Sequence, residues 1–204
     1  MTSQRQPGQR AGLSREAVLA SARTVLARDG LRSLTMRAIA EDLEVAPNAL
    51  YSHVASKSAI VDDLLDDVLA EVAEPSSDDP RTALREVMTS SYEVLLRHAD
   101  LLPVYLARQG SRGPNARRLG VITDALLTRA GLAGASVGEA RRVLIVYMIG
   151  FAAFTGSQVP LTPDDAAPIP PESARSHFAR GLDWLLAGIV QPTSERQDPT
   201  STGS

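Results

Sequence analysis

The sequence predicts an all-α protein of two domains, and three observations support this prediction. Apolar residues recur at helical spacings of three and four along almost the whole chain, instead of alternating as they do in half-buried strands. Aromatic residues make up only 4% of the chain, and Val, Leu and Ala supply most of the apolar positions. A length of 204 residues suits a small module followed by a larger one. We therefore expect two helical domains.

The segment 35–57 predicts two short helices joined by a tight turn. Thr35 can cap the first helix, because its side-chain oxygen can accept a free N–H of the first turn. The pair Glu44-Val45 leaves only enough chain for a turn before the next helix. Pro47 suits the first position of that helix, where its missing N–H is not needed.

The second short helix is expected to have one narrow buried edge, formed by Leu50 and Val54, and a free opposite face. The free face carries small or hydrogen-bonding side chains, which are the kind that can approach base edges and phosphates. Its residues are Asn48, Ala49, Ser52 and His53, with Tyr51 beside them. This pattern predicts a helix-turn-helix that binds double-stranded DNA.

A family resemblance becomes specific at this segment. The residues that carry it are Thr35, Ile39, Ala40, Val45, Leu50, Tyr51, His53 and Lys57. Together they resemble the DNA-binding signature of TetR-type (TetR/AcrR) transcriptional regulators, whose N-terminal three-helix unit precedes a helical ligand-binding and dimerisation domain. The match covers about the first quarter of the chain. Glu44 departs from the pattern, which often has Gly there, and Ala46 replaces a frequent capping Ser or Thr.

The resemblance and the side-chain chemistry divide the DNA-binding candidates into two groups. The resemblance implies backbone phosphate contacts, and the matching residues are Thr35, Tyr51, His53 and Lys57. Base contacts are expected from Arg37, Pro47, Asn48 and Ala49. Arg can bind guanine through two hydrogen bonds and Asn can bind adenine in the same way, whereas Ala and Pro can only make apolar contacts. Asn48 could instead bond its own backbone, and Tyr51 could belong partly to the core.

The net charge of −3 conceals a strong asymmetry along the chain. Residues 1–57 carry eight basic and five acidic side chains, a net charge of +3. Residues 58–79 carry eight acidic side chains and no basic one, and the remainder nets +2. Because phosphate affinity depends on the local field, the overall acidity does not exclude DNA binding.

Composition and periodicity define the expected domains. We expect a disordered arm over 1–12, a DNA-binding domain over 13–57, a ligand-binding and dimerisation domain over 58–190, and a disordered tail over 191–204. Arg5 and Arg10 of the arm could enter a minor groove, although a solvated tail is the simpler interpretation. The chain has no cysteine and no signal-peptide pattern, so a cytoplasmic location is expected.

No catalytic, cofactor or metal-binding constellation emerges from the sequence. The three histidines, His53, His98 and His177, are far apart, and no phosphate-binding glycine loop or dinucleotide fingerprint is present. The pairs Asp62-Asp63 and Asp66-Asp67 lie opposite an apolar stripe, so we interpret them as a solvated helix face and not as a metal site. The sequence thus predicts neither an enzyme nor a cofactor.

The last two predicted helices carry more apolar surface than one helical domain can cover. The helix that begins at a capping box, Ser136 with Glu139, is apolar on every side from Val143 to Phe154. It is too short and too interrupted by glycine to span a membrane. We expect it to form a homodimer interface with the final helix, 172–190.

A ligand pocket is expected inside the C-terminal domain, among residues of four helices that combine aromatic and Met surface with a few polar groups. The candidates are Tyr92, Leu96, Leu102, Tyr105, Gln109, Ile122, Tyr147, Met148, Phe151 and Phe154. Because charged residues are absent from this set, the expected effector is small and mostly apolar.

These observations favour a homodimeric repressor that small molecules release from a near-palindromic operator. The alternative is a helical protein that binds or transforms a small molecule without binding specific DNA.

Overall fold

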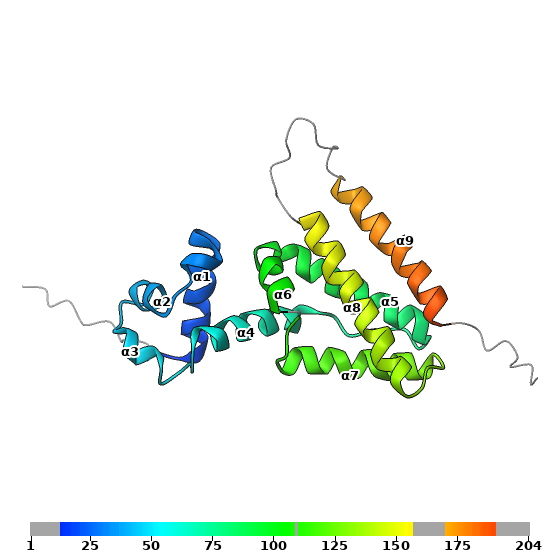
Figure 1. Ribbon diagram of the computed structural model, residues 1–204, viewed down its shortest axis with the longest axis horizontal. Helices are drawn as coiled ribbons and strands as arrows, with labels where there is room; N and C mark the ends of the chain where they lie inside the picture. Colours follow the sequence, from blue (N-terminus) through cyan, green and yellow to red (C-terminus); the bar gives the residue numbers. More distant parts are fainter. Residues whose placement is uncertain (1–12, 109, 157–169, 191–204) are drawn as a thin grey trace, which may run out of the picture. The chain divides into compact units, whose positions relative to one another are not determined.

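The computed structural model describes residues 13–108, 110–156 and 170–190, and its regular elements there are all helices (Figure 1). The all-α prediction is therefore confirmed. The chain divides into two compact units, one up to Leu65 and one from Asp66 onwards. The division falls inside helix α4, Lys57–Asp67, so this helix contributes residues to both units.

The first unit contains α1 (Arg15–Ser33), α2 (Met36–Asp42), α3 (Pro47–Leu50) and most of α4. Ser14 caps α1 by accepting the Ala17 N–H, and Gly30 interrupts the helix at φ 76°. Apolar side chains that are less than 2% exposed form the core of this unit: Val18, Ala22, Val25, Leu34, Ile39, Ala40, Leu50, Val54, Ile60, Leu64 and Leu65.

The turn between α2 and α3 depends on an unusual backbone conformation. Glu44 adopts φ 54°, and among the described residues other than glycine it is the one with positive φ. An L-residue in this region suffers a clash between its Cβ and the carbonyl oxygen that follows, which glycine avoids. The departure from glycine at this position is therefore a source of local strain.

Helix α3 is shorter than the periodicity predicts. It ends at Leu50, and Tyr51 to His53 form a hydrogen-bonded turn in which the His53 N–H donates to the Leu50 carbonyl at 2.9 Å. Its N-cap residue, Ala46, provides no side-chain cap. A four-residue helix without a cap has little stability of its own. Its position is set by the burial of Leu50 and Val54, which are at most 1% exposed.

The second unit is a helical bundle. After the 3₁₀ segment η1 (Val68–Glu71) come α5 (Pro80–Arg97), η2 (Ala99–Leu101), α6 (Leu102–Arg108), α7 (Pro114–Arg129), α8 (Ala135–Gly156) and α9 (Pro171–Ile189). Helices α5 and α8 lie side by side, and each contacts both α7 and α9 (Figure 1). The inner face of α5 is buried throughout, from Leu84 to Leu95.

Helix α8 is only partly covered within its own chain. Leu144, Met148 and Ala152 face the interior, but Val143 is 47%, Val146 64% and Phe154 73% exposed. Trp184 of α9 is 71% exposed. The helix begins at Ala135, so Ser136 lies in its first turn and not at the capping position that the sequence suggests.

The acidic residues of α4 do not form the uniformly solvated face that the sequence predicts. Asp63 forms an ion pair with Arg15, and Asp66 is only 5% exposed. Within the described residues no cluster of three or more potential metal ligands occurs. None of the described helices is long and apolar enough to cross a membrane.

The strained turn gives the first prediction. We expect Glu44→Gly to raise the free energy of unfolding by about 1 kcal/mol, because glycine adopts the positive φ without a clash. Urea unfolding of the full chain measures this change. Glu41→Gly, in the last turn of α2, is the matched control and should lower stability by about 0.5–1 kcal/mol. A loss of stability in both variants would show that Glu44 is not strained.

Candidate nucleic-acid interface and ligand cavity

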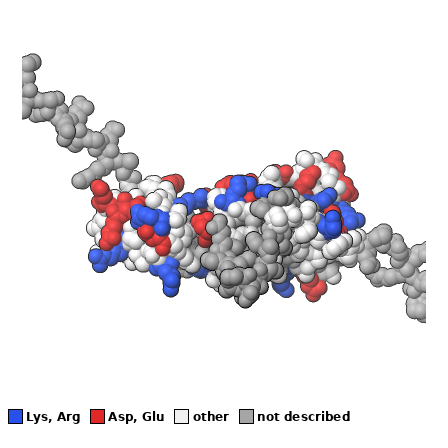
Figure 2. Space-filling view, turned by 90° about the horizontal axis from the view of Figure 1, so that it is seen from above, with Lys and Arg blue, Asp and Glu red and all other residues white. Residues whose placement is uncertain are grey.

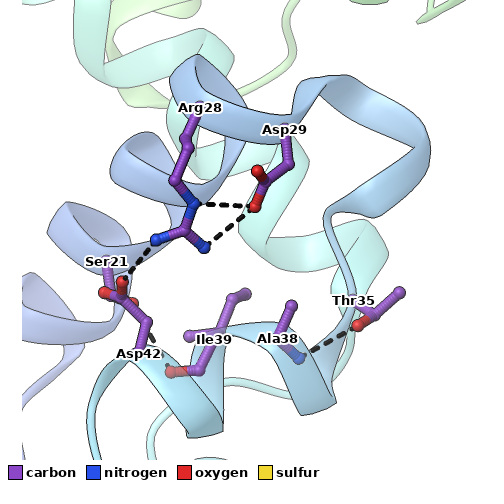
Figure 3. Close-up of polar contacts among 7 residues, drawn as sticks. All are labelled: Ser21, Arg28, Asp29, Thr35, Ala38, Ile39 and Asp42. Carbon is purple, nitrogen blue, oxygen red and sulfur yellow. Dashed lines mark hydrogen bonds and ion pairs between the residues drawn. The ribbon is translucent and has the colours of Figure 1, made fainter.

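Polar contacts fix α2 against α1 (Figure 3). The Ser21 hydroxyl donates to the Asp42 carboxylate at 2.6 Å, and Arg28 lies 3.5 Å from the other oxygen of that carboxylate. Arg28 also pairs with Asp29, its neighbour on α1, at 2.8 Å. The Thr35 hydroxyl oxygen accepts the Ala38 N–H at 3.0 Å and caps α2, as predicted. The Asp42 contacts hold the end of α2 against α1, and the Thr35 cap fixes its start. The Thr35 hydroxyl proton remains free to donate.

The nine DNA-binding candidates occupy a continuous stretch from the start of α2 to the start of α4. Seven side chains are exposed, and they are Thr35, Arg37, Pro47, Asn48, Ala49, Tyr51 and Ser52. His53 and Lys57 are half-buried. Tyr51 is 55% exposed, so the core takes up less than half of it. All nine therefore have surface available to a partner.

Two candidates already have local partners. The Arg37 guanidinium pairs through Nε with Glu41 at 2.9 Å, and both side chains are largely exposed. A surface pair of this kind contributes little stability, so a guanine or phosphate can replace it. The Ser52 hydroxyl donates to the Ala49 carbonyl at 2.7 Å, which closes the turn after α3. Ser52 can still accept a hydrogen bond.

The charge distribution is mixed. On the face shown in Figure 2, basic and acidic side chains lie next to one another, and neither sign covers the described surface. Lys57 is the first residue of α4, and Ser56 caps this helix by accepting the Ala59 N–H at 3.1 Å. The positive end of the α4 dipole therefore adds to the lysine charge where a phosphate is expected.

The second unit contains a cavity of about 140 Å³. Its walls come from η1, α5, α6, α7, α8 and the loop before α7, and no charged side chain lines it. The lining residues are Leu69, Val87, Met88, Ser91, Leu95, Tyr105, Gly110, Ser111, Ala116, Leu119, Gly120, Thr123, Ile145, Met148 and Ile149. The Ser91 and Thr123 hydroxyls each donate to a carbonyl one turn back, at 2.8 Å. Their oxygens can therefore accept a hydrogen bond from a ligand.

The structure separates the predicted ligand-binding residues into several groups. Tyr105 and Met148 line the cavity, whereas Tyr92, Tyr147 and Phe151 join Phe178 in an aromatic cluster between α5, α8 and α9. The remaining candidates lie elsewhere: Leu96 and Leu102 beside Gly156, Ile122 half-buried on α7, and Phe154 exposed on α8. Gln109 lies outside the described residues.

The aromatic cluster is tightly packed. Tyr92 stacks on Phe178 with the ring centroids 4.0 Å apart, and the Tyr147 hydroxyl donates to the Phe178 carbonyl at 2.9 Å. Burial raises the pKa of both tyrosines, so their hydroxyls stay protonated at neutral pH. A Cβ at Gly181 would lie 2.2 Å from the Tyr147 hydroxyl, so this glycine permits α9 to approach α8. The cluster works as a packed core between these helices.

Sequence reasoning missed most of the cavity wall. Val87, Met88, Ser91 and Leu95 share the inward face of α5, which helical periodicity identifies. Periodicity alone does not show which inward side chains meet a partner and which border empty space. The polar residues Ser91 and Thr123 on otherwise apolar faces were the available signal.

Comparisons with known proteins agree with this architecture. The sequence model described as "Bacterial regulatory proteins, tetR family" matches residues 18–64. A curated HTH-type transcriptional regulator of Saccharopolyspora erythraea is 29% identical, over 87% of this chain and 85% of its own.

Two solved structures show the same fold over nearly their whole length. The TetR Q116A variant of Acinetobacter baumannii, in complex with minocycline, is 28% identical with a TM-score of 0.71, over 87% of this chain and 96% of its own. BioQ with its natural double-stranded DNA operator is 26% identical with a TM-score of 0.67, over 88% of this chain and 99% of its own.

The relatives are transcriptional regulators and not enzymes. The helix-turn-helix, the helical second unit and the agreement over most of the chain lead to one assignment: the chain belongs to the TetR family of bacterial transcriptional regulators.

Proposed function

We propose that this regulator is a homodimeric repressor that binds a near-palindromic operator and that a small uncharged molecule releases it. The observation that carries the proposal is the braced helix-turn-helix, whose α3 and following turn expose Pro47 to Ser52 while Leu50 stays buried. The BioQ and TetR structures, which contain operator DNA and minocycline respectively, support the two halves of the proposal. Because its target is DNA, we place the protein in the cytoplasm.

DNA binding is divided between two kinds of contact. Arg37, Pro47, Asn48 and Ala49 are the proposed base readers, since they lie exposed at the start of α2 and α3. Thr35, Tyr51, Ser52, His53 and Lys57 surround them with hydroxyl, imidazole and ammonium groups that suit phosphates. Two such units on a two-fold axis would bind half-sites in successive major grooves.

The cavity sets the class of effector. An engineered cavity of about 150 Å³ with apolar walls is large enough for benzene, so a cavity of about 140 Å³ admits a compact apolar ligand. The oxygens of Ser91 and Thr123 add sites that accept a hydrogen bond. Uncharged walls disfavour a charged metabolite, because its charge would lose hydration without gaining a partner.

Release by such a ligand requires a difference in affinity between two states of the protein. Moving an equilibrium from 1:99 to 99:1 takes roughly 5.5 kcal/mol of differential binding. By reciprocity, bound operator must weaken ligand binding by the same factor by which the ligand weakens operator binding.

The exposed apolar residues of α8 and α9 support the dimer. Val143, Val146 and Phe154 on α8 and Trp184 on α9 are exposed in the isolated chain, although large apolar side chains gain free energy from burial. Two α8–α9 pairs from two copies would form a four-helix interface. We propose that this surface is the dimer interface.

Selection of bound duplexes from a random DNA pool tests the proposed function. A near-palindrome recovered repeatedly would establish specific binding and two-fold symmetry together. Recovery of no sequence above background would favour the alternative, a helical protein that binds a small molecule without specific DNA binding.

Loss of the Lys57 ammonium should weaken binding to every duplex equally. We expect Lys57→Ala to reduce the slope of log K against log salt by about one phosphate equivalent, because one fewer counterion is released. Titrations at several salt concentrations measure the slope. Lys57→Arg keeps the charge and is the control, and an unchanged slope in the alanine variant would remove Lys57 from the interface.

Asn48 is expected to determine which DNA sequence the protein prefers, in contrast to Lys57. We expect Asn48→Ala to lower affinity for the selected palindrome by about 1–3 kcal/mol and to relax selectivity at one symmetric pair of positions. A second round of selection with the variant measures both effects. Ser52→Ala, in the turn that follows, is the control for a phosphate contact. A uniform loss across all duplexes would show that Asn48 only positions the protein.

A charge on the exposed face of α8 or α9 should prevent dimerisation without disturbing the chain's own core. Val146→Arg and Trp184→Arg suit this test, because both side chains are exposed, whereas Leu185 and Ile189 are half-buried. We expect helical monomers that no longer bind the palindrome, as measured by sedimentation and titration. Val121→Arg, on α7 and 70% exposed, is the matched control. Dimers that persist in both variants would place the interface elsewhere.

A further inference from the structure

Asp66 is a buried carboxylate whose hydrogen bonds are made outside the helix-turn-helix. It lies in the last turn of α4, and only 5% of the residue is exposed. Its oxygens accept hydrogen bonds from the Ala116 N–H at 2.8 Å, the Asn115 N–H at 3.0 Å, the Asn115 side-chain amide at 3.2 Å and the Ser111 hydroxyl at 3.3 Å. Its backbone carbonyl also accepts from the Asn115 amide, at 3.2 Å.

These donors show that Asp66 caps the start of α7 from another helix. Helix α7 begins at Pro114, and its own N-cap residue, Gly113, has no side chain to offer. The free N–H groups of Asn115 and Ala116 are the ones that a capping side chain normally accepts. A negative charge at this end of a helix also interacts favourably with the helix dipole. We call these contacts of Asp66 with Ser111, Asn115 and Ala116 the Asp66 cap.

Gly113 is required for this arrangement. A Cβ at position 113 would lie 2.1 Å from Cγ of Asp66 and within 2.5 Å of both carboxylate oxygens. The carboxylate therefore occupies the space of the side chain that would otherwise cap α7. Any larger residue at 113 must displace Asp66.

The residues that hold Asp66 also form the cavity wall. Ser111 and Ala116 both line the cavity and both donate to the Asp66 carboxylate. Leu119, Gly120 and Thr123, further along α7, line it as well. A ligand that displaces this wall must therefore move the groups that fix the end of α4.

A second contact from α7 acts on a different segment. Arg118 donates to the carbonyls of Leu69 and Val72 at 3.2 and 3.4 Å. These residues follow α4, in and after η1. Arg118 therefore holds the chain beyond the helix, whereas Asp66 holds the helix itself.

We propose that Asp66 is the positioning residue through which the occupied cavity acts on α4, by loss or rearrangement of the Asp66 cap. This proposal rests on the proposed function, because it assigns the regulation of the same cavity. Helix α4 begins with Lys57, one of the proposed phosphate contacts, and Asp66 lies in its last turn. Displacement of the Asp66 end therefore disturbs the helix that carries Lys57.

Hydrogen exchange tests the connection without any ligand or DNA. We expect Asp66→Asn and Gly113→Ala, in the full chain, to increase amide exchange both at 115–117 and at 62–67. Asp67→Asn, which removes the same charge from the exposed neighbouring residue, should leave both segments unchanged. Faster exchange confined to 115–117 would mean that Asp66 only caps α7, and it would overturn the proposal.

Coupling measurements test the regulatory part. The probe is indole, an uncharged aromatic with one N–H donor, and the DNA is the palindrome recovered by selection. We expect saturating indole to weaken duplex binding by the wild-type protein by roughly 5- to 150-fold, the usual range of allosteric coupling. In Asp66→Asn this factor should fall below about 2-fold, while calorimetry still detects indole binding and Asp67→Asn keeps the wild-type factor.

The outcomes separate this proposal from the proposed function. Full coupling in Asp66→Asn would overturn the role of Asp66 and leave the repressor assignment intact. Wild-type protein that binds indole without any change in duplex affinity would contradict ligand release, and the exchange comparison would then decide the Asp66 connection by itself. Gly113→Ala should reproduce the coupling loss of Asp66→Asn, and combining the two changes should add nothing, because both remove one interaction.

Discussion

The proposed DNA-binding surface depends on the burial of two side chains, Leu50 and Val54. Helix α3 has four residues and no side-chain cap, so its own hydrogen bonds cannot stabilise it. Leu50 and Val54 are almost completely removed from water, which fixes the helix and its following turn from within. The exposed residues between and before these two side chains are therefore held in defined positions by the buried anchors and not by a stable helix. Helix α1 supplies the other side of this core, and Asp42 ties α2 to it through Ser21.

Local electrostatics matter more here than the net charge of the chain. The Glu41 carboxylate pairs with Arg37, one of the proposed base contacts, and exchanging one exposed anion for another requires little free energy. Asp63 pairs with Arg15, and Asp66 is satisfied by N–H and O–H donors, so two of the acidic residues of α4 are already compensated inside the protein. A negatively charged helix therefore follows the DNA-binding segment without presenting all of its charge to DNA.

The sequence predicted well those features that depend on neighbouring residues. The predicted Thr35 cap on α2 is present, because an N-cap requires only a short polar side chain before a helix. The true length of α3 and the burial of Asp66 were not predictable, since both depend on residues far away in the chain. The cavity shows the same limit. Tyr92 and Tyr105 lie on inward faces and have the same chemistry, yet Tyr92 stacks on Phe178 whereas Tyr105 lines the cavity.

Helix α7 is capped by a residue of another helix, and this cap does more than stabilise α7. A Ser, Thr or Asp at position 113 could cap this helix locally and contribute about 1 kcal/mol, without burying a charge from another element. Gly113 leaves that task to Asp66, whose burial requires every hydrogen bond it receives. A local cap would stabilise α7 whatever α4 does, whereas a cap from α4 makes the start of one helix and the end of the other form together. The same start of α7 also lines the cavity. The stability of α7 therefore depends on the position of α4, and Asp66 connects the cavity wall to that helix.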